Sequence, residues 1–358
     1  MSMGHADAGP APPAHESPGI PGTTFGPVPS RRFGRSLGVN YIPPKVCTYS
    51  CVYCQVGRTV QMRAEPGVFY GARSITAEVR RHVEAARRAD ERVDHVTIVS
   101  DGEPTLDVAL GGIISLLRPL GIPIAVITNG SLLFRPDVRA ALGRADRVSV
   151  KVDTVRDEVW RRINRPHRRL DLSAVLGGIE AFAREFEGRL TTETMLVAGV
   201  NDDEDQLRAT AAFLGSIRPA VAYLAVPTRP PAEPWVLPPE PRAVAQAHEV
   251  FRAFLPHVEL LLGYEGDEFA STGDAVADLL SITAVHPMRE AAVHRLMSRR
   301  HAPWSAVDAL VEEGTLAAVR YGPHRYYVRT VGRRPGASES RGRSSTRNPG
   351  SPDTQSDR

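Results

Sequence analysis

The sequence predicts an α/β fold of the partial (β/α)6-type barrel kind, in which a curved and mostly parallel sheet is covered by helices. Short runs rich in Val, Ile and Thr alternate with amphipathic helical stretches over about 230 residues, as in parallel sheets with helical crossovers. Polar segments that contain glycine follow several of these runs, and ligand sites of such barrels lie at the carboxyl ends of the strands. A doubly wound open sheet would alternate in the same way, and periodicity does not separate the two arrangements.

Seven strands and six intervening helices are expected in chain order. The strands are runs of mostly β-branched or apolar residues, namely residues 36–42, 95–100, 124–128, 147–152, 191–197, 222–226 and 258–262. The helices are the amphipathic stretches between them, namely residues 76–89, 110–117, a segment beginning at Pro136, 173–186, 204–215 and 242–254. Pro136 supports a helix start, because proline is favoured in the first helical turn.

Five regions are expected along the chain. Residues 25–262 form the predicted barrel, residues 263–284 a connecting segment and residues 285–332 a small C-terminal domain. The two ends, residues 1–24 and 333–358, are built largely from Gly, Pro, Ser and charged residues. Such segments bury too little apolar surface to offset the entropy of ordering, so we expect both ends to be disordered.

The small C-terminal domain is predicted to consist of helix, turn, helix and hairpin. The expected helices are residues 289–299 and 305–313, separated by a turn at Pro303-Trp304, and the hairpin is residues 316–331. This order resembles a winged-helix module, which implies contact with nucleic acid. The alternative is a capping subdomain that packs on the barrel or on another protein.

Charge and hydropathy restrict the partners. The net charge is +3, and the excess of Arg lies after residue 285, so any attraction for nucleic acid is concentrated in the last fifth of the chain. No apolar run approaches the ~18 residues needed to span a bilayer. The first 22 residues lack an apolar segment preceded by basic residues, so a secretory signal is not indicated. We therefore expect a cytoplasmic protein with no membrane partner.

All three cysteines fall within eight residues, at Cys47, Cys51 and Cys54. An odd number of clustered cysteines indicates metal or redox chemistry and not a disulfide framework. Zinc sites usually need four ligands, and no second Cys or His pair at finger spacing follows nearby. A [4Fe–4S] cluster also takes four thiolates, so three leave one iron open to a substrate or cofactor. A three-cysteine zinc or redox site is the alternative.

The spacing of the three cysteines, with the aromatic Tyr53 just before the last of them, resembles the cluster loop of the radical S-adenosylmethionine (SAM) superfamily. The resemblance implies a [4Fe–4S] cluster on Cys47, Cys51 and Cys54, with SAM chelated to the open iron by its amino and carboxylate groups. It also implies an external one-electron reductant. In that family the reduced cluster cleaves SAM to a 5′-deoxyadenosyl radical.

Further motifs follow the next strands. Asp101-Gly102-Glu103-Pro104 comes directly after residues 95–100 and resembles the Gly-Gly-Glu motif of the family, with Asp101 in place of the first glycine. The resemblance implies that Gly102, Glu103 and Pro104 contact the amino group of SAM, for which backbone carbonyls and a carboxylate are suited.

Asn129 follows the third expected strand, and Ser149, Lys151 and Asp153 alternate at the end of the fourth. The resemblance implies that these four residues and Tyr53 contact SAM. Alternation places the side chains of Ser149, Lys151 and Asp153 on one side of the strand, which in a barrel can face the lumen. The family uses this position for contacts to the ribose and carboxylate of SAM. The alternative is a buried ion pair between Lys151 and Asp153. Residues 196–202 resemble the strand and loop that support adenine.

Two segments suggest an anionic substrate such as a nucleotide or RNA. Residues 161–169 carry five Arg, which suit phosphate or carboxylate recognition, although a solvated helix start explains such a run equally well. The proline-rich residues 227–241 are expected to cover the substrate, with Trp235 able to stack on a flat ring.

Residues 26 to about 330 resemble the iron–sulfur oxidoreductases related to the wyosine-forming tRNA enzymes. Those enzymes use a second cluster and a lysine that forms an imine with pyruvate, and no cysteines remain here for a second Cys-ligated cluster. The only lysines, Lys45 and Lys151, are the candidates for a catalytic amine. Two other functions stay open: an activase that places a glycyl radical on a partner protein, and an iron–sulfur DNA-binding sensor.

Overall fold

The computed structural model describes residues 23–263 and 274–330, and its main feature is a curled sheet of eight strands in the order β1-β2-β5-β6-β7-β8-β9-β10. Strands β1 and β2 pair antiparallel, and every other neighbouring pair is parallel. The strands are β1 (Thr24–Ser30), β2 (Gly34–Val39), β5 (His95–Ile98), β6 (Ile124–Thr128), β7 (Arg147–Lys151), β8 (Arg189–Met195), β9 (Val221–Ala225) and β10 (Val258–Leu261). The predicted α/β partial barrel is thereby confirmed.

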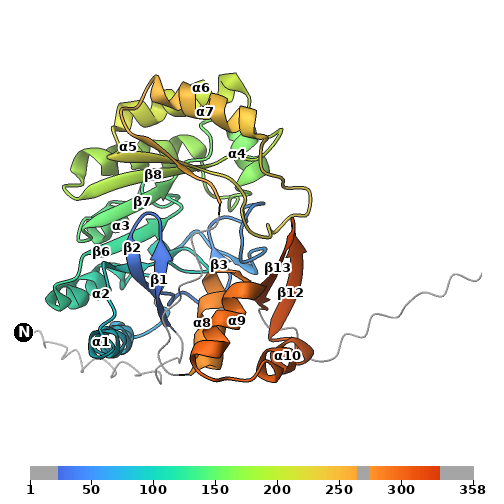
Figure 1. Ribbon diagram of the computed structural model, residues 1–358. Helices are drawn as coiled ribbons and strands as arrows, with labels where there is room; N and C mark the ends of the chain where they lie inside the picture. The colour runs from blue at the N-terminus through green and yellow to red at the C-terminus, as the bar shows by residue number, and fades with distance from the viewer. Residues whose placement is uncertain (1–22, 264–273, 331–358) are drawn as a thin grey trace, which may run out of the picture.

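Helices cover one side of this sheet, along the left and upper side of the strands in Figure 1. They are α1 (Ala72–Arg88), α2 (Leu110–Leu117), α3 (Pro136–Leu142), α4 (Asp157–Ile163), α5 (Leu172–Glu185), α6 (Glu204–Ile217) and α7 (Pro241–Arg252). The side chains of Val79, Val96, Ile98 and Ile114 are fully buried between helices and sheet. All four residues of β5 are buried, as expected of a parallel strand that is covered on both faces.

All seven predicted strands and six predicted helices are present, with ends that differ by a few residues. Strand β1 was not predicted, because its sequence TFGPVPS contains two prolines and a glycine, which strands tolerate mainly at a sheet edge. β1 is such an edge strand. Of the segment predicted to be disordered, residues 1–22 lie outside the described residues, whereas Thr23 and Thr24 are buried and hydrogen-bonded to Glu78.

The C-terminal elements form a second, smaller layer. They are α8 (Ala275–Val285), β11 (Met288–Arg289), α9 (Glu290–Arg299), α10 (Ser305–Glu312), β12 (Leu316–Tyr321) and β13 (His324–Arg329), with the strands in the order β11-β13-β12. The predicted connecting segment therefore contains helix α8. The predicted tail, residues 333–358, lies outside the described residues. The winged-helix interpretation and the domain boundaries stay predictions.

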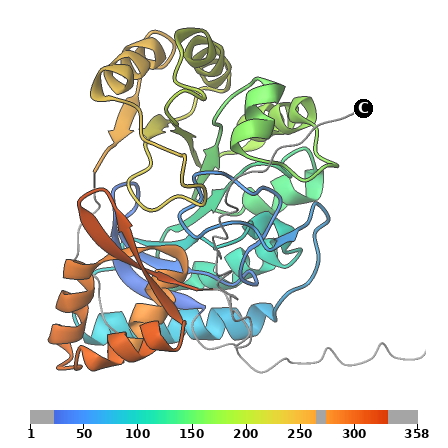
Figure 2. The ribbon, with the colours of Figure 1, turned by 90° about the vertical axis from the view of Figure 1, so that its right-hand side faces the viewer.

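The C-terminal elements share a core with the first strand of the sheet. Leu279, Ile282 and Val285 of α8 pack in one apolar cluster with Phe25 and Val28 of β1. Figure 2 shows the hairpin β12–β13 beside the loop that follows β9. The Tyr321 and Tyr326 hydroxyls, both on this hairpin, donate hydrogen bonds of 3.0 Å to backbone carbonyls of that loop. No helix within the described ranges is both long and apolar enough to cross a membrane.

Candidate functional site

A cavity of about 290 Å³ opens at the carboxyl ends of the parallel strands. Its wall combines residues that follow β5, β6 and β9, the last residues of β7 and β8, the β1–β2 hairpin, and Val285 and His286 at the end of α8. Pockets that bind small molecules begin at about 300 Å³ and usually lie at this end of a parallel sheet. All three cysteines line the cavity.

The cysteine loop is held in place at both of its ends. Strand β3 (Val46–Cys47) pairs with β4 (Gln61–Met62), which closes the loop. The backbone N–H of Val52 donates to the carbonyl of Ile163 at 2.9 Å, and that of Ser50 to the carbonyl of Asn164 at 3.0 Å. The loop therefore rests on the end of helix α4, and the backbone positions the three sulfur atoms.

All three cysteines are free, and their surroundings favour metal-bound thiolates. Burial raises the pKa of the Cys47 thiol, and raises the pKa of Cys51 to about 12, so neither ionises at neutral pH without a cation beside it. Within the described residues, no three Cys, His, Asp or Glu side chains converge as a single metal ion requires. A cubane cluster does not need that convergence, because each of its thiolates binds a different iron. The donor set fits a cluster better than a lone zinc ion.

Gly102 brings the segment after β5 onto the cysteine loop. A Cβ atom at Gly102 would lie 2.1 Å from the carbonyl oxygen of Val46, so no larger residue fits. The next residue, Glu103, donates its backbone N–H to that same oxygen at 3.1 Å. Pro104 then begins a short 3-10 helix, Pro104–Leu106.

Glu103 is fully buried and joins two strand ends. Its carboxylate accepts hydrogen bonds from the Thr105 hydroxyl at 2.7 Å, the Thr128 hydroxyl at 2.6 Å and the backbone N–H of Asn129 at 2.8 Å. Glu103 and Asn129 both line the cavity, as the sequence predicted for SAM contacts. The hydrogen bonds of Glu103 fix both residues on the cavity wall, and the contact of Glu103 and Asn129 with SAM stays a prediction.

Asp101 is a cavity residue that sequence reasoning treated only as a replacement for glycine. Its side chain is buried, and its Oδ1 has no hydrogen-bond partner within the described residues. Burial raises the pKa of Asp101 to about 6, although the positive charge of Lys45 acts in the opposite direction. The acid that departs from the family motif is the one sequence feature that distinguishes this position.

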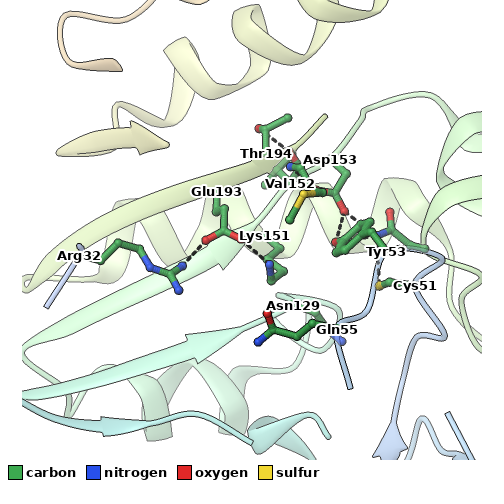
Figure 3. A network of polar contacts seen from close by, with 12 residues as sticks. Arg32, Cys51, Tyr53, Gln55, Asn129, Lys151, Val152, Asp153, Glu193 and Thr194 are labelled. Carbon is green, nitrogen blue, oxygen red and sulfur yellow. Dashed lines mark hydrogen bonds and ion pairs between the residues drawn. The ribbon is translucent and has the colours of Figure 1, made fainter. Parts of the chain in front are cut away.

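Lys151 lines the cavity, and the alternative interpretation, an ion pair with Asp153, is not what the structure shows. Its ammonium lies 2.5 Å from Glu193 Oε1, and the Arg32 guanidinium binds the other oxygen of that carboxylate, as Figure 3 shows. Burial by itself would raise the pKa of Glu193, but the charges of Arg32 and Lys151 outweigh it and lower the pKa to about 2. Arg32 lies in the segment with which the family resemblance begins, but the sequence assigned it no role, and Glu193 had no motif around it.

Asp153 instead supports Tyr53 and the cysteine loop. Its carboxylate accepts hydrogen bonds from the Tyr53 hydroxyl at 2.5 Å, Asn164 Nδ2 at 2.6 Å and the backbone N–H of Met195 at 2.9 Å (Figure 3). Ser149 is fully buried, and neither Ser149 nor Asp153 is part of the cavity wall. Of the three alternating residues, only Lys151 reaches the cavity.

The arginine run at residues 161–169 lies outside the cavity wall, and much of it is paired within the chain. Its ion pairs are Arg161–Asp157 at 2.7 Å, Arg165–Glu233 at 2.5 Å and Arg169–Glu65 at 3.5 Å. The predicted stacking residue, Trp235, is 44% exposed and also lies outside the cavity wall, with the Arg162 guanidinium 5.9 Å from its ring centroid. Arg162 and Arg165 therefore connect the end of α4 to the loop after β9.

The chain is similar to known radical SAM proteins over part of its length. The model of the radical SAM superfamily matches residues 41–211. A GTP 3′,8-cyclase of Streptomyces coelicolor is 29% identical over 164 residues, which cover 44% of this chain and 44% of that protein. A solved structure, a radical SAM methyltransferase from Sphaerobacter thermophilus, has 19% identity and a TM-score of 0.48, with 64% of this chain and 67% of that chain covered.

A UPF0026 protein of Methanocaldococcus jannaschii is similar over nearly its whole length. It is 40% identical over 309 residues, which cover 86% of this chain and 96% of the relative. The superfamily match includes all three cysteines and the motifs after β5, β6 and β7. The chain thus belongs to the UPF0026 family and is a radical SAM enzyme, a class that uses a [4Fe–4S] cluster and S-adenosylmethionine.

Proposed function

We propose that Cys47, Cys51 and Cys54 hold the [4Fe–4S] cluster and that SAM occupies the adjoining cavity for reductive cleavage. When bound and reduced, the cluster supplies the electron that cleaves SAM to the 5′-deoxyadenosyl radical. The observation that carries this proposal is the position of all three sulfur atoms on the wall of one cavity at the carboxyl ends of the strands. An external one-electron donor must reduce the cluster.

Two charged side chains on the cavity wall match the two charges of the methionine part of SAM. The unpartnered Oδ1 of Asp101 can accept hydrogen bonds from the ammonium group, and the Lys151 ammonium can pair with the carboxylate. Glu193 holds Lys151 in place, and Asp153 holds the Tyr53 ring, which lies 5.6 Å from Lys151 Nζ. Pairing both charges would orient SAM towards the cysteines.

The experiment is electron paramagnetic resonance of the reconstituted, dithionite-reduced enzyme with and without SAM. SAM that binds an open iron changes the signal of the reduced cluster, so we expect a changed spectrum in the wild type. Lys151→Gln should require more SAM for the same change, whereas Arg161→Gln, which lies outside the cavity wall, should not. A cluster whose spectrum is unchanged by saturating SAM would refute the proposed site.

For the substrate we propose a nucleotide, free or within RNA. The partial similarity to GTP 3′,8-cyclase supports this class, as does Arg32 on the cavity wall, whose Nε has no hydrogen-bond partner within the described residues. The paired arginine run does not add support. The test supplies deuterated nucleotides or RNA and measures deuterium in the 5′-deoxyadenosine produced. Deuterium transfer only from a partner polypeptide would favour the activase instead.

A further inference from the structure

Each cysteine sulfur has one side-chain N–H group directed at it, and each donor comes from a different part of the chain. The donor and sulfur pairs are Asn129 Nδ2 to Cys47 Sγ at 3.7 Å, Asn164 Nδ2 to Cys51 Sγ at 3.5 Å, and Lys45 Nζ to Cys54 Sγ at 3.6 Å. A thiol sulfur is a weak acceptor, but a thiolate carries negative charge and accepts strongly. The three donors therefore complement cysteines that are bound to metal.

Lys45 is the most informative of the three donors. Its side chain is only 3% exposed, and its backbone has a left-handed φ of 62°, which costs free energy in a residue other than glycine. The ammonium donates to the carbonyl of Gly57 at 2.6 Å, and the charge of the nearby Asp101 carboxylate acts on it without a salt bridge within the described residues. A buried ammonium is costly without a negative partner. The thiolate of Cys54, 3.6 Å away, would supply that charge.

Asn164 is held on several sides, so its amide direction is defined. It is the C-cap residue that follows the last residue of α4, and its side chain is buried. Its backbone carbonyl accepts a hydrogen bond from the backbone N–H of Ser50. Its Nδ2 donates to Asp153 at 2.6 Å and also faces Cys51. Because an amide has two N–H groups, both contacts can be made at once.

We propose that Lys45 and Asn164 are positioning residues that raise the reduction potential of the cluster through N–H···S hydrogen bonds and, for Lys45, through its charge. This inference rests on the proposed cluster at the three cysteines. Reduction adds negative charge to the cluster, so nearby donors and a cation stabilise the reduced state more than the oxidised state. Asn129 is left out because it is also a predicted SAM contact, so replacing it would alter two interactions.

The test is an anaerobic redox titration without SAM, followed by electron paramagnetic resonance, with iron and sulfide content measured for every variant. Lys45→Met and Asn164→Ala should each shift the midpoint potential to a more negative value. Lys45→Arg keeps the positive charge, so its potential should lie between those of Lys45→Met and the wild type. Two matched controls should leave the potential unchanged. Arg58→Gln removes a charge from the same loop, and Thr59→Val removes a loop hydrogen bond to the carbonyl of Tyr49.

A second measurement uses the unaltered side chains. The chain contains only two lysines, Lys45 and Lys151, so lysine labelled with ¹⁵N at Nζ marks two sites alone. We expect a ¹⁵N coupling to the reduced cluster that persists in Lys151→Arg, where Lys45 is the remaining lysine. If the Lys45 and Asn164 variants fail to retain their clusters, this coupling tests whether Lys45 Nζ contacts the cluster.

The outcomes separate this inference from the function on which it rests. Wild-type protein that forms no [4Fe–4S] cluster after reconstitution would contradict the proposed function. A loaded wild type, with Lys45→Met and Asn164→Ala at the wild-type potential, would overturn the inference and leave the proposed function intact. Absence of the ¹⁵N coupling, where the variants lose their clusters, would also overturn it.

Discussion

Glu193 shows how single charged residues are fixed in the cavity wall. Its carboxylate is buried between Arg32 and Lys151, which lie 161 and 42 positions away in the chain. Removal of this carboxylate would leave both cations without their partner, and a charge that is removed from water without a partner is strongly unfavourable. The three side chains therefore stabilise one another, and the free energy of this stabilisation depends on pH through the charge of Glu193.

Glu193→Gln tests this stabilisation. The pKa of Glu193 is lowered from 4.5 to about 2 on folding, so the carboxylate stabilises the protein fully above pH 4.5 and loses that contribution as the pH falls towards 2. We expect the variant to lose about 3 kcal/mol of unfolding free energy at pH 7. The difference from the wild type should shrink between pH 4.5 and 2. Urea denaturation across this range measures both effects, and a constant difference would contradict the assignment.

Gly102 is a residue at which close approach leaves no room for a side chain. Its Cβ would meet the backbone oxygen of Val46, which cannot rotate away. We expect Gly102→Ala to lower the free energy of unfolding by about 1–3 kcal/mol. It should also lower the iron retained after reconstitution, because the displaced segment contacts the cysteine loop at Val46. Gly112→Ala is the matched control, since nothing lies within 4 Å of its Cβ and alanine favours the helix. Equal iron retention in both variants would show that the contact is not needed.

Among the elements, the loop after β9 has the clearest mechanical role. Glu233 in this loop pairs with Arg58 at 2.8 Å and with Arg165, and its backbone N–H donates to the carbonyl of Val52 at 3.0 Å. Val236 packs beneath it against Val52. These contacts connect the loop, the cysteine segment and the end of α4.

Glu233→Gln should loosen these connections. Its partners are largely exposed, and ion pairs with exposed partners contribute little, so we expect a loss of only about 1 kcal/mol. Amide hydrogen exchange should rise in residues 50–58 and 229–237. Arg161→Gln, which breaks a pair within one helix, should leave exchange in both segments unchanged. Faster exchange in neither segment of Glu233→Gln would contradict the connecting role.

The elements also show what a sequence can predict. The seven parallel strands were recognisable because they are compact runs rich in apolar and β-branched residues, and β5 and β9 are buried along their whole length. Strand β1 was hidden by its prolines. The all-round apolar helix α8 was overlooked because its sequence, AVADLLSITAV, lacks a polar stripe. Its core partners, Phe25 and Val28, lie about 250 residues earlier, and only the folded chain brings them together.

At the scale of the whole molecule, this shared core predicts one cooperative unfolding unit. Leu279 is fully buried in it, so Leu279→Ala should cost about 2–5 kcal/mol. Fluorescence of Trp304, in a protein whose other two tryptophans are replaced by Phe, and far-ultraviolet circular dichroism should report the same urea midpoint. An earlier transition of Trp304 would show that the C-terminal elements unfold independently.

The site could be predicted where its chemistry is local in sequence. The cysteines, Tyr53, Gly102 and Glu103 lie in short motifs with fixed spacing. Asn164 and Glu193 could not be found in this way, because they act through partners more than 40 positions away, Cys51 and Lys151. The pairing of the arginine run was only partly visible in the sequence, because Asp157 lies four positions from Arg161 whereas Glu233 and Glu65 lie far from Arg165 and Arg169.

If the three cysteines hold a cluster that cleaves SAM, the enzyme must release 5′-deoxyadenosine. The most direct measurement is 5′-deoxyadenosine formed anaerobically by the reconstituted enzyme with dithionite and SAM, in the wild type and in Cys51→Ala. We predict formation by the wild type and none above background by the variant. A fully loaded and reduced wild type that forms no 5′-deoxyadenosine, even with nucleotide and RNA substrates supplied, would contradict the proposed cleavage of SAM.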